Sequence, residues 1–336
     1  MRYKSELRAV HGGRGKYITG IDKELLDFSA NINPYPPKLD LAITDDALTS
    51  YPDDDYLLLK EAIARHHGCR PENITVGNGS VEVIRTLCHT VLDKGQKYLV
   101  PDHTFAEYEL SARLAGAERT TDYKKASLSF ICNPDNPSGI LLQKQEILSR
   151  LSQYTQYNKD HILCVDEAFI DLADPFHSAS GTIEPGLFVL RSLTKNFAIA
   201  GVRFGYGIGE PELISSMEVM RPPWTVNSLA EKAAISAFSR YSELEYSRTM
   251  INKEKKRLKK SIDDIGWKYS DGSANYLLID TLRPSEQITG LFLKSGILVR
   301  DCRSFGLPTS IRVAVRTTEE NDKFIEALEK VSSCLH

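Results

Sequence analysis

Between residues 74 and 208, short apolar runs alternate with stretches whose apolar residues recur at helical spacing. Short apolar runs bounded by turn residues are typical of buried strands. The runs cover residues 74–76, 97–100, 127–132, 162–165, 187–190 and 204–208. Between the first two, Val81, Ile84, Cys88 and Val91 follow steps of three or four residues, as in a helix with one buried face. This alternation predicts an α/β fold built on a mainly parallel, doubly wound sheet.

The chain on either side of this alternation has a different pattern. The first 40 residues hold a glycine pair and an Asn-x-Asn-Pro turn, which predict a loop-rich arm without its own core. A long helical tract covers 227–262, and we expect its basic run, 253–260, to be a solvated face. Other expected elements are helices at 57–67, 285–294 and 319–331, and strands at 276–279, 297–300 and 311–315. The predicted parts are an arm, 1–40, which joins the small domain and closes the site, a large domain, 41–225, and a small α+β domain, 226–336.

Charge and cysteine content narrow the possible partners. The 336 residues include 42 basic and 45 acidic side chains, for a net charge of -3, which gives no electrostatic case for nucleic acid or an anionic membrane. No apolar run approaches membrane-spanning length, so we expect a soluble, cytoplasmic protein. The six cysteines form no CxxC pair and no metal-ligand spacing, so we expect no metal, and buried free thiols at Cys88, Cys132 and Cys164.

One lysine follows the apolar run 187–190 directly. Lys195 has Ser192 three residues before it and Arg203 eight residues after it. A nearby guanidinium makes a lysine lose its proton more easily, and a neutral amine attacks carbonyl groups. The alternative is a surface lysine beside an unrelated arginine.

A glycine turn joins the first strand to the helix that follows it. Gly77-Asn78-Gly79-Ser80 would expose free N–H groups at a helix N-terminus, which suits a phosphate. Ordinary strand-to-helix turns look the same, so this motif alone is weak. It matches neither GxxxxGK[ST] nor GxGxxG, so nucleotide-binding readings lack support.

Two further polar motifs follow apolar strands. Asn136 lies in Cys132-Asn133-Pro134-Asp135-Asn136-Pro137-Ser138-Gly139, where a rigid side chain could donate to a ligand oxygen. Asp166 follows 162–165, so it would be partly buried and would need a partner such as a protonated ring nitrogen, unless it caps the next segment. In a doubly wound sheet, ligands bind outside the carboxyl ends of the strands, where all these motifs fall. This coincidence predicts an active site.

As a set, these motifs resemble the fold-type I pyridoxal-phosphate enzymes, the aspartate-aminotransferase superfamily. The shared motifs are GNGS, CNPDNPSG, VDEAF, and SLTK with an arginine eight residues after the lysine, in the family's order and over nearly the whole chain. The resemblance implies the family's α/β fold and pyridoxal 5′-phosphate as cofactor. In such enzymes the cofactor does the carbanion chemistry, while the protein supplies orientation and charge.

The resemblance also implies a role for each motif residue. Lys195 would be the Schiff-base lysine, Asp166 would pair with the pyridinium nitrogen, and Asn136 would donate to the ring hydroxyl oxygen. Phe105 would stack on the ring, with Tyr108 the less favoured candidate. The implied phosphate-end residues are Gly79, Ser80, Ser192, Thr194 and Arg203.

A residue far from these motifs implies an assembly. By resemblance, Tyr51 would reach the cofactor phosphate of a neighbouring subunit. We therefore expect a homodimer with shared sites.

Two branches of the family compete for the reaction. Motifs similar to L-threonine-O-3-phosphate decarboxylase are His11-Gly12-Gly13, the segment 27–34 and Thr104-Phe105-Ala106-Glu107-Tyr108. Phe169 stands where the histidinol-phosphate aminotransferase branch usually has tyrosine. We therefore expect decarboxylation of L-threonine O-3-phosphate to (R)-1-amino-2-propanol O-2-phosphate and carbon dioxide, in cobalamin biosynthesis. The alternative is histidinol-phosphate aminotransferase or a related aminotransferase.

Either phosphorylated amino substrate needs fixed cations. Arg300 and Arg312 lie at or within expected small-domain strands, and by resemblance both reach the active site, where their guanidinium forks suit carboxylate and phosphate. Arg312 should face away from apolar Ile311 and Val313. The substrate contacts expected from the arm are His11, Gly12, Ser29 and Asn31.

Overall fold

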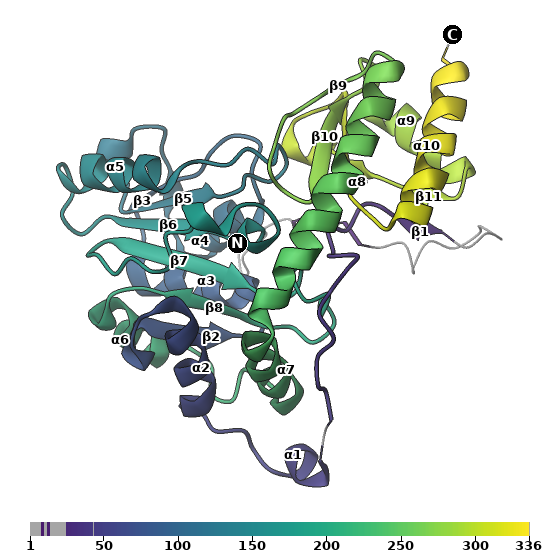
Figure 1. Ribbon diagram of the computed structural model, residues 1–336. Coiled ribbons are helices and arrows are strands. Elements are labelled where there is room, and N and C mark those ends of the chain that lie inside the picture. The colour runs from purple at the N-terminus through teal and green to yellow at the C-terminus, as the bar shows by residue number, and fades with distance from the viewer. Residues whose placement is uncertain (1–7, 10–11, 14–24, 43, 336) are drawn as a thin grey trace.

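The computed structural model describes residues 8–9, 12–13, 25–42 and 44–335, and its larger lobe is built on a seven-stranded sheet (Figure 1). The strand order is β2-β8-β7-β6-β5-β3-β4, in which β4 was not predicted. The strands are β2 Ile74–Gly77, β3 Lys97–Leu99, β4 Glu118–Arg119, β5 Leu128–Cys132, β6 Ile162–Asp166, β7 Leu187–Ser192 and β8 Gly205–Ile208. All neighbours from β7 to β4 pair in parallel, whereas β8 runs antiparallel to both β7 and β2. The predicted mainly parallel α/β sheet is confirmed.

Helices cover both faces of this sheet because its central strands are apolar on both sides. One face packs against α3 Ser80–Val91, α4 Glu107–Ala115 and α6 Pro211–Met220. The other face packs against α5 Lys144–Thr155, through Ile147 and Leu151. The predicted thiols at Cys88, Cys132 and Cys164 are buried and free.

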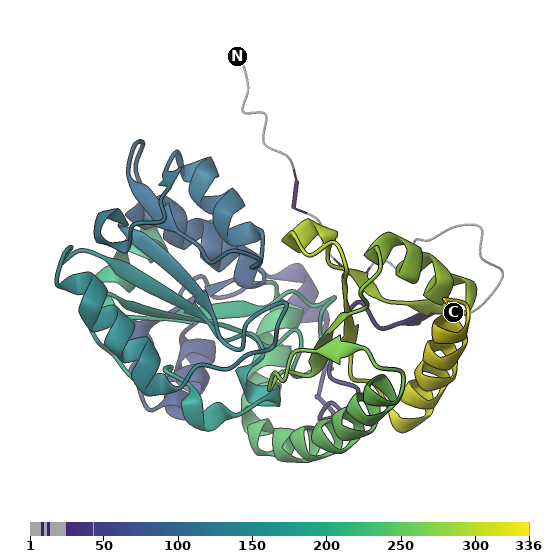
Figure 2. The same ribbon diagram turned by 90° about the horizontal axis from the view of Figure 1, so that it is seen from above.

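The smaller lobe carries a four-stranded antiparallel sheet in the order β12-β13-β10-β9 (Figure 2). Its strands are β9 Lys268–Tyr269, β10 Tyr276–Asp280, β12 Arg300–Asp301 and β13 Ser310–Ala314, and its helices are α8 Leu244–Asp264, α9 Ser285–Lys294 and α10 Thr318–Ser333. The arm joins this lobe, since β1 Leu26–Asp27 pairs in parallel with β11 Ile297–Leu298.

The remaining helices lie at the edge of the large lobe or are single turns. Helix α2, Leu57–His67, packs against α7, Ser228–Ser239, near α1, Asp45–Thr49 (Figure 1). Single 3-10 turns are η2 Pro71–Asn73, η3 Tyr123–Lys125, η4 Ile170–Leu172, η5 Pro175–His177, η6 Tyr241–Glu243 and η7 Arg303–Phe305. The domain boundaries at 40 and 225 stay a prediction. No helix in the described part of the chain is long and apolar enough to cross a membrane.

Three local predictions differ from the structure. The tract 227–262 is broken at Arg240 into α7, η6 and α8. The predicted strand 297–300 is divided at Val299, because Ile297–Leu298 pairs with the arm and Arg300–Asp301 pairs with β13. The basic run 253–260 is not wholly solvated: Lys255 is buried and donates to the Gly272 carbonyl oxygen at 3.0 Å.

Candidate active site

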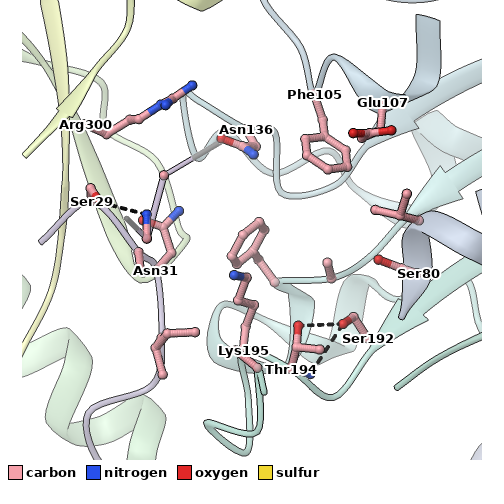
Figure 3. Close-up of a pocket in the computed structure, with 18 of the residues that line it drawn as sticks. Ser29, Asn31, Ser80, Phe105, Glu107, Asn136, Ser192, Thr194, Lys195 and Arg300 are labelled. Atoms are coloured by element: carbon pink, nitrogen blue, oxygen red, sulfur yellow. Dashed lines mark hydrogen bonds between the residues drawn. The ribbon is translucent and has the colours of Figure 1, made fainter. Parts of the chain in front are cut away.

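A cavity of about 1270 Å³ lies at the carboxyl ends of β5, β6 and β7, with walls from both lobes and from the arm (Figure 3). Most of the predicted site residues line it. They are Gly12, Ser29, Asn31, Ser80, Phe105, Asn136, Asp166, Ser192, Thr194, Lys195, Arg203, Arg300 and Arg312. Tyr51 is not in this wall but on the surface, 79% exposed, and His11 lies outside the described residues.

Lys195 occupies the turn after β7, and its side chain points into the cavity (Figure 3). The backbone N–H of Asn33 donates to the Lys195 carbonyl oxygen at 3.0 Å, which ties the arm to this turn. Burial, with smaller contributions from the positive charges of Arg312 and Arg203, lowers the pKa of Lys195 to about 8. The predicted effect of Arg203 is therefore present, but desolvation is the larger cause.

Asp166 ends β6 and is 4% exposed. The Tyr108 hydroxyl donates to its Oδ2 at 2.6 Å, and the Ala168 backbone N–H donates to its Oδ1 at 2.9 Å. Burial nevertheless raises the pKa of Asp166 to about 6. A buried carboxylate that lines a cavity is suited to a cationic ligand group, because a positive partner offsets the cost of its desolvation.

Phe105 and Tyr108 have different surroundings. Phe105 lines the cavity and meets Tyr108 edge-on at 5.4 Å between ring centroids. Tyr108 instead stacks on Phe130 at 4.8 Å and directs its hydroxyl to Asp166. Both rings line the cavity, and stacking of Phe105 rather than Tyr108 on a cofactor ring stays a prediction.

Hydroxyls and a guanidinium gather where α3 begins. Ser80 is the first residue of α3, and Ser192 Oγ lies 2.8 Å from Thr194 Oγ1. Gly79 precedes Ser80 with φ of +81°, and a Cβ there would lie 2.5 Å from Arg203 Nη2. Only glycine therefore allows the guanidinium to sit against this turn. Free N–H groups, hydroxyls and a fixed cation together fit a phosphate dianion.

The two small-lobe arginines are neighbours, since Arg300 and Arg312 are paired residues of β12 and β13. Arg312 is 6% exposed, donates through Nη1 to Asn136 Oδ1, and donates through Nη2 to the Ser29 carbonyl oxygen at 3.0 Å. Arg300 donates to Ser304 Oγ at 2.7 Å and lies over the Phe305 ring. As predicted, Arg312 faces the cavity. Among the described residues, no carboxylate forms a salt bridge with Arg312.

The cavity wall includes charged residues that were not predicted. Arg316 and Glu320 line it, with Arg316 Nη2 donating to Glu320 Oε1 at 2.7 Å. Glu107 also lines it, beside Phe105 and Ser80 in Figure 3. The sequence held one signal for Arg316: it lies four residues after Arg312, an even spacing that places both on one face of an extended chain, although β13 itself ends at Ala314.

Comparison with known proteins identifies the family. Residues 23–328 match the family model described as aminotransferase class I and II. Histidinol-phosphate aminotransferase of Moorella thermoacetica is 30% identical, over 94% of this chain and 89% of the relative. The crystal structure of histidinol-phosphate aminotransferase from Clostridium acetobutylicum is 30% identical with a TM-score of 0.81, covering 92% of this chain and all of that one. The histidinol-phosphate aminotransferase from Sinorhizobium meliloti, solved in complex with pyridoxal-5′-phosphate, has a TM-score of 0.82 at 21% identity, covering 94% and 92%.

These matches overturn the predicted decarboxylase. The relatives at about 30% identity are named as histidinol-phosphate aminotransferases. L-threonine-O-3-phosphate decarboxylase from Porphyromonas gingivalis is 21% identical with a TM-score of 0.79, which shows a shared fold alone. Phe169 was given too much weight: its ring packs edge-on against Tyr276 at 5.1 Å in the cavity wall. One missing hydroxyl there does not determine which substrate bond breaks.

The cavity fits pyridoxal phosphate by the chemistry of its donors. An amine with a lowered pKa, a buried carboxylate and a group of hydroxyls beside a guanidinium match the aldehyde, the ring nitrogen and the phosphate of that molecule. Asn31 Oδ1 and Arg312 Nε are buried without a hydrogen-bond partner among the described residues. These two atoms leave polar capacity for a bound substrate.

The free chain should form its covalent linkage with pyridoxal phosphate at a rate that rises with pH and levels off above about pH 8. Only the neutral amine attacks an aldehyde, and the pKa of Lys195 is about 8, so the reactive fraction falls roughly tenfold per pH unit below that value. Borohydride trapping at a series of pH values, quantified by peptide mass, measures the rate. A rate that still climbs above about pH 10 would indicate an ordinary exposed lysine instead.

Proposed function

This chain belongs to the class I and II aminotransferase family, and we propose that it transfers the amino group of histidinol phosphate, or of a closely similar phosphorylated amine, to a 2-oxo acid. The observation that carries the proposal is the pair of buried arginines, Arg300 and Arg312, across the cavity from Lys195. The 30% identity to histidinol-phosphate aminotransferase over 94% of the chain supports this substrate.

The cofactor is pyridoxal phosphate, which supplies an electron sink for the carbon that loses a proton. The residues proposed to hold its phosphate are Ser80, Ser192, Thr194 and Arg203. Asp166 would hold a proton on the ring nitrogen, because a buried carboxylate favours a cation beside it. Asn136 and Phe105 would fix the orientation of the ring.

Lys195 is proposed to act twice. Its Nζ anchors the cofactor and afterwards, as a free amine, removes the proton from the substrate Cα. A general base works best when its pKa lies near the operating pH, and the pKa of Lys195 near 8 meets that condition. Because Nζ lies inside the cavity, the same atom can also return the proton.

The arginines would hold the substrate anion. Arg312 is fixed by Asn136 and by the Ser29 carbonyl oxygen, which leaves its Nε to donate to a ligand. Arg300, its paired neighbour, adds a second guanidinium on the same side. Two guanidinium groups held in place can bind first the phosphate of the amine donor and then the carboxylate of the oxo-acid acceptor. The arm, through Asn31 and Gly12, would cover the bound substrate.

We further propose that the chain works as a homodimer. Tyr51 is exposed and lies against Trp224 at 4.6 Å, and the nearby Leu48, Leu57 and Leu58 are also exposed. Several large exposed apolar side chains in one short segment are expected where a second protein covers them. A partner subunit seated here would receive Tyr51 at its own cofactor phosphate, as the resemblance implies.

Incubation of the holoenzyme with histidinol phosphate and 2-oxoglutarate should produce glutamate in proportion to the histidinol phosphate consumed. The matched variant Arg312→Lys keeps a positive charge but loses the paired N–H donors of the guanidinium. Its KM for the phosphorylated amine should therefore rise roughly tenfold to a hundredfold, which corresponds to the loss of one charge-assisted hydrogen bond. Release of carbon dioxide from threonine phosphate without any glutamate formation would overturn the proposal, and so would an unchanged KM.

A further inference from the structure

A cluster of five polar residues, four of them buried and one partly buried, lies behind the wall that carries Lys195 and Asp166. It consists of Glu167, Asp171, Arg191, Asn196 and Tyr241, which we call the Arg191 cluster. None of the five lines the cavity. Arg191 is 2% exposed, and Glu167 and Asn196 are fully buried, so the cluster is shielded from solvent. Moving a charge from water into the protein interior costs several kcal/mol, and burying even a neutral polar group without a partner costs on the order of 1–3 kcal/mol. A buried cluster of charged groups is therefore expected to have a structural or functional role.

Arg191 stands at the centre of the cluster and bridges two carboxylates. Its Nη1 donates to Glu167 Oε2 at 2.7 Å, and its Nη2 donates to Asp171 Oδ1 at 2.5 Å. The Tyr241 hydroxyl donates to Asp171 Oδ2 at 2.7 Å and accepts from Arg191 Nη2 at 3.0 Å. Asn196 Nδ2 donates to the same Asp171 Oδ2. Both oxygens of Asp171 are thereby engaged.

Two members of the Arg191 cluster are next in sequence to the two residues of the site that carry the chemistry. Glu167 follows Asp166, and Asn196 follows Lys195. The Glu167 backbone N–H also donates to the Leu190 carbonyl oxygen at 2.8 Å, which ties the end of β6 to β7. Arg191 binds Glu167 directly and reaches Asn196 through Asp171, so it links the strand end that presents the carboxylate to the turn that presents the amine.

The Lys195 turn is held from its other side by the arm. The Asn33 backbone N–H donates to the Lys195 carbonyl oxygen, and Asn33 Nδ2 donates to the Asn196 carbonyl oxygen at 2.7 Å. Asn33 Nδ2 also donates to Ser247 Oγ of α8 at 3.0 Å. The backbone at Lys195 is thus fixed by Asn33 on one side and by the Arg191 cluster on the other.

We propose that the residues of the Arg191 cluster are positioning residues, which set where Lys195 Nζ stands relative to Asp166. They act through hydrogen bonds to the two segments and not through charge at Nζ. The positive charges that act on Lys195 come from the cavity, at Arg312 and Arg203. A shift of about 1 Å in a reacting group costs up to roughly a hundredfold in rate, so a rigid turn has a direct effect on reactivity.

The test uses Tyr241→Phe, which removes the hydroxyl bonded to Asp171 and leaves the ring. Thr75→Val is the matched control. Thr75 lies on β2 and does not line the cavity, and its Oγ1 donates to the Glu218 carboxylate at 2.6 Å. Both variants lose one hydroxyl-to-carboxylate hydrogen bond. Borohydride trapping of pyridoxal phosphate added to the free chain then measures the rate of linkage at Lys195, and thermal unfolding measures stability.

Tyr241→Phe should lower the linkage rate roughly tenfold, with the midpoint of its pH dependence unchanged, since geometry and not charge is altered. Thr75→Val should lose similar stability with an unaltered rate. An equal loss of rate in both variants, or no loss in Tyr241→Phe, would overturn the proposal.

Asn196→Ala provides a second variant if Tyr241→Phe fails to fold. It separates the Lys195 turn from Asp171 while leaving both Arg191 ion pairs in place. The same loss of linkage rate is expected, and an unchanged rate would count against the proposal. Because the readout uses the cofactor and no substrate, its result is independent of whether histidinol phosphate is the amine donor.

Discussion

Replacing Lys195 with alanine should abolish the borohydride-stable attachment of pyridoxal phosphate and lower amino transfer by roughly 10⁴-fold, the upper range for a positioned acid–base group. The variant loses the anchoring amine and the proposed base in one step. The substitution also removes a half-buried amine that is costly to keep charged, since burial lowers its pKa. The variant protein should therefore fold. Peptide mass after borohydride treatment and the rate of glutamate formation measure the two effects.

Lys255→Met is the control for this experiment. Burial lowers the pKa of Lys255 to about 7, further than that of Lys195, yet Lys255 lies against the Gly272 carbonyl oxygen and does not line the cavity. A reactive pKa alone would therefore select the wrong lysine. Lys255→Met should keep the attachment, whereas a yellow adduct that survives in Lys195→Ala would mean that another lysine is the anchor.

The strand ends were predictable because local patterns fix them. Apolar runs identified β5, β6 and β7, and the polar residues directly after them include Asn136 and Lys195, both of which line one cavity. Parallel strands bring their carboxyl ends to one edge whatever lies between them. The cofactor was implied by the family resemblance that these motifs carry.

Contacts between distant segments could not be predicted in this way. The partners of Arg191 come from 13 to 50 residues away, and nothing in the pattern of a buried strand says which carboxylates will meet a guanidinium at its end. Helix α8 was expected to be continuous with α7, since the break at Arg240 carries neither glycine nor proline. Lys255 was expected in solvent because its neighbours are basic, whereas tertiary packing buries it.

The choice of reaction was wrong for a related reason. It relied on short arm motifs and on one hydroxyl missing at Phe169, whereas the motifs that imply the cofactor belong to the family as a whole. The bond that breaks depends on how Arg300 and Arg312 orient the substrate, and side-chain identity leaves that orientation open. Similarity over the whole length of the chain carries more information than any of these single positions.

Replacing Asp166 with asparagine should lower amino transfer by roughly 10²- to 10³-fold, because a neutral amide cannot hold a proton on the ring nitrogen. Loss of one partner of a buried ion pair costs about 3–5 kcal/mol, and about 1.4 kcal/mol corresponds to each factor of ten. The side chains have the same shape, and the amide oxygen can still accept from the Ala168 N–H while Nδ2 donates to the Tyr108 hydroxyl oxygen, so the fold should persist. The rate of glutamate formation by the holoenzyme measures the effect.

Tyr108→Phe separates charge from geometry at the same position. It removes the 2.6 Å hydrogen bond to Asp166 but keeps the carboxylate, so its loss should be about tenfold or less. Because the Tyr108 hydroxyl lowers the pKa of Asp166 against the larger effect of burial, that pKa should rise in the variant. The acid limb of the pH–rate profile should then move to higher pH, since the carboxylate becomes protonated sooner as the pH falls. If Asp166→Asn instead keeps activity within tenfold of the parent, the carboxylate does not hold the ring proton and Asp166 only orders the turn through the Ala168 N–H.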